Sequence, residues 1–214
     1  QMQEKPGFIR SLFYAGLKLA KREREGEKLG FMDNLTLTLA RKIIFKKVLK
    51  RFGGNLRIAV SGASALSPDV AEFVNDIGIS LYEGYGLSEN TGELTVNYPG
   101  ARRFGSVGKP LPGVKIEIDN SVQGSKQEDG EIVAYGENIM LGYHNLPEKT
   151  NETITPDGGL RTGDLGHLDS EDYLYITGRV KEQYKLDIGE YVAPAPLEET
   201  LKLSAYIDQV MIYG

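Results

Sequence analysis

The residues of this chain best suited to chemistry lie in one glycine-rich segment with the sequence YEGYGLSE. Tyr85 has a flat face on which an adenine ring can stack, while Gly84 and Gly86 let backbone approach a ligand closely. Ser88 can donate to a phosphate oxygen, and Glu89 is a hard oxygen ligand of the kind that Mg²⁺ binds together with phosphates. The segment therefore suits a nucleotide phosphate and its metal, although a tyrosine between glycines is also common in a turn packed on a core.

Three further segments carry polar groups at turns. The sequence SGASALS at residues 61–67 follows an apolar strand, so its backbone can form one wall of a slot or simply a tight connection to a helix. Asp164, within RTGDLG, can project from a turn and accept bonds from two vicinal ribose hydroxyls, but a lone Asp in a turn is usually a local cap. Arg179 can pair with a ribose or a phosphate and Lys181 can act as a charged pivot, although such a basic pair is usually solvated.

The composition excludes several classes of protein. The 214 residues are 40% hydrophobic, which is enough for a substantial core in one or two domains. The net charge of -5 argues against a nucleic-acid binder. There is no cysteine and only two histidines, so disulfides and thiolate or histidine-rich metal sites are not expected. No apolar run reaches the roughly 18 residues that cross a bilayer, and the N-terminus lacks the pattern of a signal peptide. We expect a soluble, cytoplasmic protein.

The first part of the chain has helical periodicity. Apolar residues recur at helical spacing over residues 8–25, and a second helix is expected over 35–51. In the second helix we expect Leu35, Leu39, Ile43 and its neighbours to form one apolar face, and Arg41, Lys42, Lys46, Lys47 and Lys50 to form a basic one. Such a basic face can contact anionic lipid. A solvated helix packed on its own domain is the favoured alternative, because the region has few aromatic anchors.

The rest of the chain alternates strands and turns. The next elements are expected in the order strand, helix, strand: a strand at 56–60, a proline-initiated helix from Pro68 to about residue 77, and a strand at 79–82. This βαβ order indicates a parallel sheet with ligand-binding loops at its carboxyl ends. Further strands are expected around residues 114–118 and 131–135. Residues 166–168 and 173–176 are expected to form a hairpin.

The polar segments occur in one chain and in one order, and together they resemble the adenylate-forming (acyl-activating) enzymes, most closely the long-chain fatty acid CoA ligases. The resemblance implies an α/β fold, in which residues 1–178 are the later part of a large AMP-binding domain with a βαβ sheet and a small β subdomain. Residues 179–214 would then begin a small C-terminal domain. It also implies ATP, Mg²⁺, a fatty acid and CoA as ligands, with no nucleic acid. Peripheral membrane contact is left open.

The resemblance also assigns roles to residues. Glu89 would bind the metal and act in catalysis, Lys181 would be the hinge about which the small domain turns, Asp164 would hold the ribose, and Arg179 would contact the nucleotide. The nucleotide-binding set is Gly62, Ala63, Ser64, Glu83, Gly84, Tyr85, Gly86, Ser88, Asp164 and Arg179. Ala63 stands where the family often has glycine, and Ser88 where it usually has threonine. Lys185, Gly189 and Tyr191 would lie in a loop that swings towards the thioester-forming site.

Two parts of the family pattern have no match in this sequence: the Ser/Thr/Gly-rich phosphate loop and the C-terminal lysine that stabilises charge at the acyl phosphate. We therefore expect this polypeptide alone to show no turnover. A non-catalytic nucleotide-binding or interaction module explains the same features. Within enzymes, a fatty acyl-AMP ligase or an aryl-CoA ligase is the nearest alternative.

Overall fold

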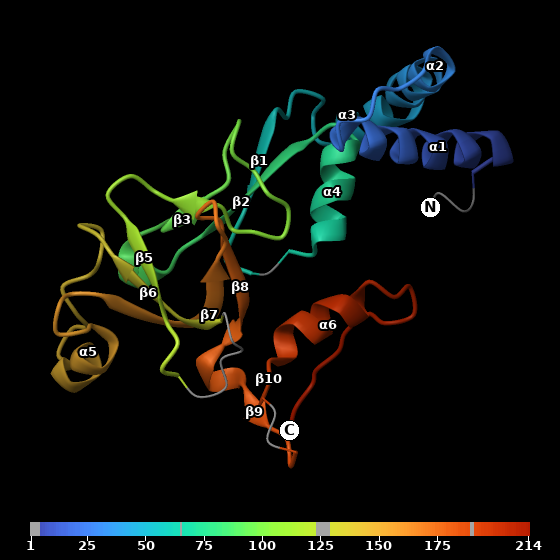
Figure 1. Cartoon of the computed structure of the whole chain (residues 1–214). Coiled ribbons are helices and arrows are strands. Elements are labelled where there is room, and N and C mark those ends of the chain that lie inside the picture. The colour runs from blue at the N-terminus through green and yellow to red at the C-terminus, as the bar shows by residue number, and fades with distance from the viewer. Residues whose placement is uncertain (1–4, 65, 123–128, 189–190) are drawn as a thin grey trace. The chain divides into compact units, whose positions relative to one another are not determined.

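The computed structural model of the chain describes residues 5–64, 66–122, 129–188 and 191–214 (Figure 1). These residues form an α/β structure, as expected. They divide into two compact units, one built from the described parts of residues 1–60 and 68–81, and the other from those of 61–67 and 82–214. The domain division expected between residues 178 and 179 stays a prediction.

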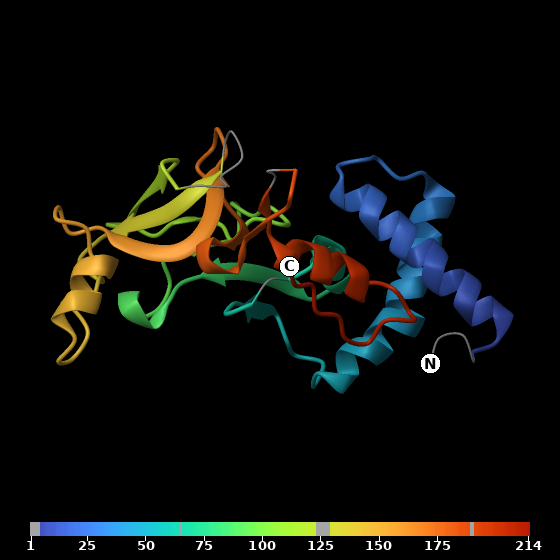
Figure 2. The same ribbon diagram turned by 90° about the horizontal axis from the view of Figure 1, so that it is seen from below.

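The first unit is mainly helical. It contains α1 (Gly7–Arg24), α2 (Phe31–Ala40), α3 (Lys46–Arg51) and α4 (Pro68–Asp76). In both views α1 and α2 lie side by side (Figures 1 and 2). Arg24 at the end of α1 ties this helix to α4, because its guanidinium bonds Asp76 at 2.8 Å and Glu72 at 2.8 Å. The core comprises Leu12, Phe13, Leu19, Ala20, Leu37, Ala40, Ile44, Phe45, Ile77 and Ile79.

The second expected helix differs from the sequence prediction in two ways. It begins at Phe31, and a π-helical turn, Arg41–Phe45, joins α2 to α3. The expected apolar face is wrong for Leu35, Leu39 and Ile43, which are 46%, 41% and 37% exposed, whereas Ile44, a neighbour of Ile43, is buried. The buried residues Leu37, Ala40 and Ile44 lie on the other side of the helix. This side shares a core with buried residues of α1, against which the helix packs.

The second unit is built mainly from β-strands. One sheet has the order β1-β2-β3-β4, and its strands are β1 (Ile58–Ser61), β2 (Ser80–Tyr85), β3 (Thr95–Val96) and β4 (Lys109–Pro110). β2, β3 and β4 pair antiparallel. β1 and β2 each contribute residues to both units. The βαβ pattern predicted β1, α4 and β2 in this order, and β1 and β2 are neighbours in the sheet.

A second sheet is an antiparallel meander. Its strands β5 (Lys115–Asp119), β6 (Gly130–Tyr135), β7 (Leu160–Leu168) and β8 (Leu174–Arg179) pair in chain order. Figure 2 shows β6 and β7, in yellow and orange, running alongside one another. The predicted hairpin is confirmed by β7 and β8, in which His167 lies opposite Tyr175.

Short elements complete this unit, and the sequence patterns did not predict them. They are α5 (Pro147–Thr153), the paired β9 (Tyr184–Lys185) and β10 (Tyr191–Val192), and α6 (Pro194–Lys202). The core of the unit comprises Tyr85, Leu94, Ile116, Ile132, Ala134 and Leu174. Across the described segments, none of the helices combines the length and the apolar character that a bilayer-crossing span needs.

The close approach of α1 and α2 gives a test of the helical unit. A Cβ added at Gly16 would lie 2.4 Å from the Cβ of Ala40. We expect Gly16→Ala to lower the free energy of unfolding, because overpacking costs about 1 to 3 kcal/mol and exceeds the roughly 1 kcal/mol gained in helix propensity. Gly7→Ala is the matched control in the same helix, since no atom lies within 4 Å of that added Cβ. Denaturant unfolding should separate the two variants, and equal stability would contradict the close contact.

Candidate functional site

The glycine-rich segment forms a tight loop at the end of β2. After Tyr85 the chain passes through a 3-10 turn, Ser88–Asn90, and returns so that the Leu94 N–H donates to the Tyr85 carbonyl at 2.7 Å. Asn90 closes this loop from inside. Its side chain accepts from the Leu87 N–H at 2.6 Å and donates to the Gly92 carbonyl at 2.9 Å, and the residue is 1% exposed. The loop shape is therefore set by buried hydrogen bonds of its own.

Gly86 in this loop is required by backbone contacts within the protein, whereas the nearest contact of Gly84, in β2, is the flexible end of a side chain. A Cβ at Gly86 would lie 1.7 Å from the carbonyl oxygen of Gly92, so any side chain there would force the loop apart. A Cβ at Gly84 would lie 2.8 Å from Oε2 of Glu93. The sequence suggested that these glycines let a ligand approach, and for Gly86 the structure adds a second reason, the close approach of the returning strand.

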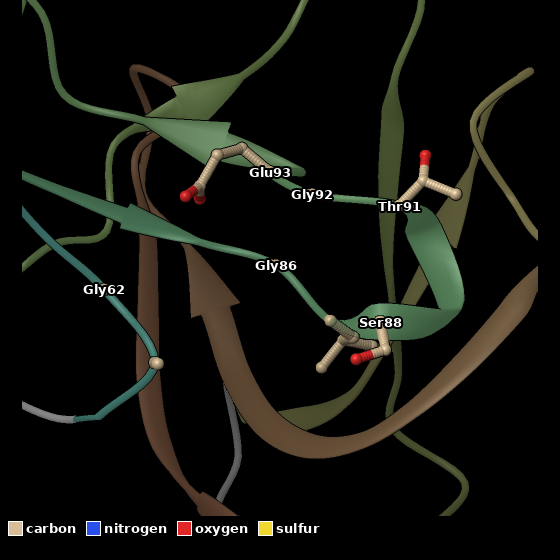
Figure 3. Close-up of a pocket in the computed structure, with 8 residues that line it drawn as sticks. Gly62, Gly86, Ser88, Thr91, Gly92 and Glu93 are labelled. Atoms are coloured by element: carbon tan, nitrogen blue, oxygen red, sulfur yellow. The ribbon is translucent and has the colours of Figure 1, made fainter.

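The loop forms one side of an open pocket of about 450 Å³. The opposite side is the loop after β1, where Gly62 lies (Figure 3). The pocket is lined by Gly62, Ala63, Gly86, Leu87, Ser88, Thr91, Gly92 and Glu93. Four of the residues in the predicted nucleotide-binding set are thus brought to one cavity from two separate segments of the chain.

Ala63 adopts an unusual backbone conformation in this pocket. Its φ angle is +68°, in the left-handed region that glycine adopts freely and that costs an alanine about 1 to 2 kcal/mol. The sequence comparison above noted that glycine is frequent at this position in the resembling family. The positive φ gives a physical reason for that preference. Ser64, the next residue of the predicted set, is exposed and does not line the pocket.

Asp164 joins three of the predicted motifs. Its carboxylate is 5% exposed and accepts a hydrogen bond from the Tyr85 hydroxyl at 2.6 Å and one from Nε of Arg179 at 2.7 Å. Tyr85 comes from β2, Asp164 from β7 and Arg179 from the end of β8, where it lies directly opposite Asp164 in the strand register. Asp164 lies within β7 and not in the turn that the sequence suggested, and the Thr162 hydroxyl accepts from the Asp164 N–H at 3.1 Å. Residues from three separate segments therefore meet around one buried carboxylate.

The Tyr85 hydroxyl acts as a hydrogen-bond donor to Asp164. Burial, the charge of Asp164 and the hydrogen bond to that carboxylate all raise the pKa of Tyr85, so the phenol keeps its proton. The same bond to Asp164 raises the pKa of Arg179. Tyr85 is 8% exposed and is not among the residues that line the pocket. Its proposed role, stacking on an adenine, stays a prediction.

Glu89 projects from the 3-10 turn and is half-buried. Its Oε1 accepts from the Tyr143 hydroxyl at 2.7 Å, which raises the pKa of Tyr143, and its carbonyl accepts from the Met140 N–H at 2.8 Å. Among the described residues, no group of three or more acidic or histidine side chains is arranged to hold a metal. A single carboxylate nevertheless fits Mg²⁺, which is usually bound by one or two carboxylates and the phosphates of the substrate.

Glu83, Lys181 and Gly189 are further residues to which the sequence analysis assigned a role. Glu83 is 7% exposed. Burial raises the pKa of its carboxyl to about 7, although a hydrogen bond from the Gly105 N–H acts to lower that pKa. Lys181 is exposed in the 3-10 turn Val180–Glu182, directly after Arg179. Gly189, which the resemblance placed in a swinging loop, lies outside the described residues.

Sequence reasoning missed several residues that shape this region. Asn90, Thr91 and Glu93 follow the predicted motif directly, and Tyr143 lies 54 residues from its partner Glu89. A sequence signal was available for Asn90, because a buried asparagine after a turn often bonds the neighbouring backbone. No local pattern indicates Tyr143.

A family model described as AMP-binding enzyme matches residues 16–144 of this chain. The chain belongs to this family. Among curated proteins, a long-chain-fatty-acid–CoA ligase of Mycobacterium bovis is 37% identical over 173 residues, which are 81% of this chain and 27% of that protein. A long-chain-fatty-acid–CoA ligase of Xenopus laevis is 38% identical over 178 residues, or 82% of this chain and 24% of that protein. The AMP-binding chain thus spans about a quarter of the length of these relatives.

Solved structures of the same kind have a similar fold. An anthranilate CoA ligase in complex with anthranoyl-AMP superposes with a TM-score of 0.62 at 28% identity, over 72% of this chain and 30% of that one. The o-succinylbenzoate coenzyme A synthetase of Bacillus subtilis, in complex with ATP and magnesium ion, gives 0.61 at 28% identity, over 73% and 34%. Both belong to the adenylate-forming CoA ligases, so the expected family and fold class are confirmed.

The buried Glu83 carboxyl of this AMP-binding chain predicts a pH-dependent stability. Its pKa is about 7 when folded and near 4.5 when exposed. Between these values the folded state holds a proton that the unfolded state has released, so the free energy of unfolding falls as pH rises. Across this pH window we expect the free energy of unfolding of wild type to fall by about 3 kcal/mol relative to that of Glu83→Gln. Above the window we expect no further change in this difference.

Denaturant unfolding at several pH values measures this difference. Glu148→Gln, which changes an exposed carboxylate on α5, is the matched control. Its free energy of unfolding should depend on pH in the same way as that of wild type. A stability difference between wild type and Glu83→Gln that stays constant from pH 4.5 to 7 would contradict the raised pKa.

Proposed function

We propose that this chain is part of an AMP-forming ligase that activates a long-chain fatty acid and transfers it to CoA. One observation carries the proposal: the Asp164 carboxylate binds Tyr85 and Arg179, which lie 79 and 15 residues away in the sequence. These contacts bring three of the predicted nucleotide-binding residues together from β2, β7 and β8. The long-chain-fatty-acid–CoA ligases that match over four fifths of this chain support the choice of substrate.

The proposed reaction has two steps. The fatty acid carboxylate attacks the α-phosphorus of ATP, which forms an acyl adenylate and releases pyrophosphate. The CoA thiol, deprotonated as it reacts, then attacks the acyl carbonyl, forms the thioester and releases AMP. Mg²⁺ would neutralise phosphate charge in the first step. Because negative charge develops on the phosphates, donors and cations fixed in place contribute most of the acceleration.

The residues of this chain would bind and orient the nucleotide. Asp164 has its two oxygens bonded to Tyr85 and Arg179, but each oxygen retains a second lone pair and can accept a ribose hydroxyl. Ser88 would donate to a phosphate oxygen, and Glu89 would hold Mg²⁺ by its carboxylate. Lys181 would be the pivot of the small domain. Since the chain spans about a quarter of its relatives, we expect it to need the rest of the enzyme for turnover.

Three other functions remain to be separated by experiment. An aryl-CoA ligase is favoured by the structural match to an anthranilate CoA ligase, and a fatty acyl-AMP ligase would perform only the first step. A non-catalytic nucleotide-binding module would bind ATP without pyrophosphate release. Incubation of the full-length protein with ATP, CoA and fatty or aryl acids distinguishes these functions by which thioester or adenylate accumulates.

Substitution of the two carboxylates tests the site. In the full-length protein we expect Glu89→Ala and Asp164→Ala each to lower the rate of acyl adenylate formation at least about a hundredfold, because a fixed electrostatic contact is lost in the transition state. Exchange of pyrophosphate into ATP, dependent on the fatty acid, measures this step. Glu148→Ala is the matched control on the surface. Rates at the control level in both variants would refute the assignment.

Lys181 is expected to behave differently. If this residue is a pivot, Lys181→Ala should slow thioester formation at least about tenfold more than adenylate formation, because domain rotation precedes the second step. Rapid-quench measurements of the two half-reactions report this ratio. Equal losses in both would count against the pivot, while Lys202→Ala on α6 controls for the loss of a positive charge.

A further inference from the structure

Tyr143 holds one oxygen of the Glu89 carboxylate. Its hydroxyl donates to Oε1 at 2.7 Å, and both residues are half-buried. Among the described residues, no hydrogen-bond donor pairs with the other oxygen, Oε2. Glu89 directly follows Ser88, which lines the pocket. The protein therefore fixes one oxygen of this carboxylate and leaves the second without a protein partner.

The backbone around Tyr143 is itself held in place. The Met140 N–H donates to the Glu89 carbonyl at 2.8 Å, so the segment that leads to Tyr143 is tied to the turn that carries Glu89. The Tyr143 N–H donates to Oγ1 of Thr150 on α5 at 2.9 Å. Gly142 permits this close approach, because its φ is +147° and a Cβ there would lie 2.7 Å from Cγ2 of Thr150. The phenol that contacts Glu89 is thus fixed from both sides.

A fixed donor changes how a carboxylate binds a cation. An unrestrained glutamate populates several rotamers and loses this freedom when it binds a metal. A hydrogen bond to a group that is already held restricts the rotamers before the metal binds, so less freedom is lost on binding. Groups that orient a metal ligand in this way change the metal affinity about 10- to 100-fold.

We propose that Tyr143 is a positioning residue that orients Glu89 towards the Mg²⁺ of a bound Mg²⁺–ATP complex. The inference rests on the function proposed above, in which Glu89 holds this metal, and it adds a residue to which that function gives no role. Tyr143 acts through the bond to Glu89. It therefore strengthens the binding of ATP that carries a metal and not the binding of ATP alone.

Binding of ATP in the absence of an acid substrate tests this role without turnover. Equilibrium dialysis of radiolabelled ATP with the full-length protein gives one Kd in Mg²⁺ and another in EDTA. We expect Tyr143→Phe, which removes only the hydroxyl, to raise the Kd for Mg²⁺–ATP about tenfold. The Kd for metal-free ATP should change less than about twofold, because Glu89 then has no metal to hold.

Tyr135→Phe is the matched control. This variant also removes a bond from a tyrosine hydroxyl to a carboxylate, the one to Asp157 at 3.2 Å, and neither residue lines the pocket. Both dissociation constants should stay at the wild-type value. An equal loss of Mg²⁺–ATP and of metal-free ATP binding in Tyr143→Phe would overturn the inference, since the hydroxyl would then support only the structure of the loop.

A double-mutant cycle asks whether Tyr143 acts through Glu89. In a Glu89→Gln background, Tyr143→Phe should raise the Kd for Mg²⁺–ATP less than about twofold further, because the ligand that it orients has already been weakened. A full tenfold increase in that background would also overturn the inference, since Tyr143 would then act independently of Glu89.

The outcomes separate this inference from the proposed function. If Glu89→Gln weakens the binding of Mg²⁺–ATP and Tyr143→Phe does not, the role of Tyr143 fails and the proposed function stands. If Glu89→Gln also leaves this binding at the wild-type level, the metal-binding role of Glu89 fails, and the inference fails with it.

Discussion

The buried carboxylate of Asp164 is the group on which the arrangement of this site depends. An ionised carboxylate removed from water is strongly destabilising unless donors surround it. Here the Tyr85 hydroxyl and the Arg179 guanidinium supply those donors, from the first sheet and from the neighbouring strand of the second. The Asp164 carboxylate thereby orients the Tyr85 ring and the Arg179 guanidinium, and it links the strands that carry them.

The register of the second sheet makes this possible. Asp164 and Arg179 are directly opposite one another in β7 and β8, and the pairing shifts just afterwards, between Leu165 and Gly166. In an antiparallel pair, residues directly opposite each other project to the same face. A slip of one residue would move the cation to the other face of the sheet and leave the carboxylate with a single donor.

The pocket depends on a second constraint, close packing of backbone on backbone. The chain leaves and returns so tightly that a Cβ at Gly86 would clash with the Gly92 carbonyl, and Asn90 bonds the backbone inside the loop. Walls made of backbone and small residues leave few polar side chains to set specificity. Glu93 is the one charged residue among those that line the pocket.

The sequence by itself determined the family, the order of the main elements and most of the polar groups of the site, because glycine-rich turns and apolar periodicity are local properties. It did not determine which stripe of the helix at residues 31–51 is buried, since Leu35 and Leu37 are equally apolar and only packing against α1 chooses between them. Nor could it find the bond between Tyr143 and Glu89, or show that Tyr85 and Asp164 meet. Contacts between residues far apart in the chain exist only after the strands have paired.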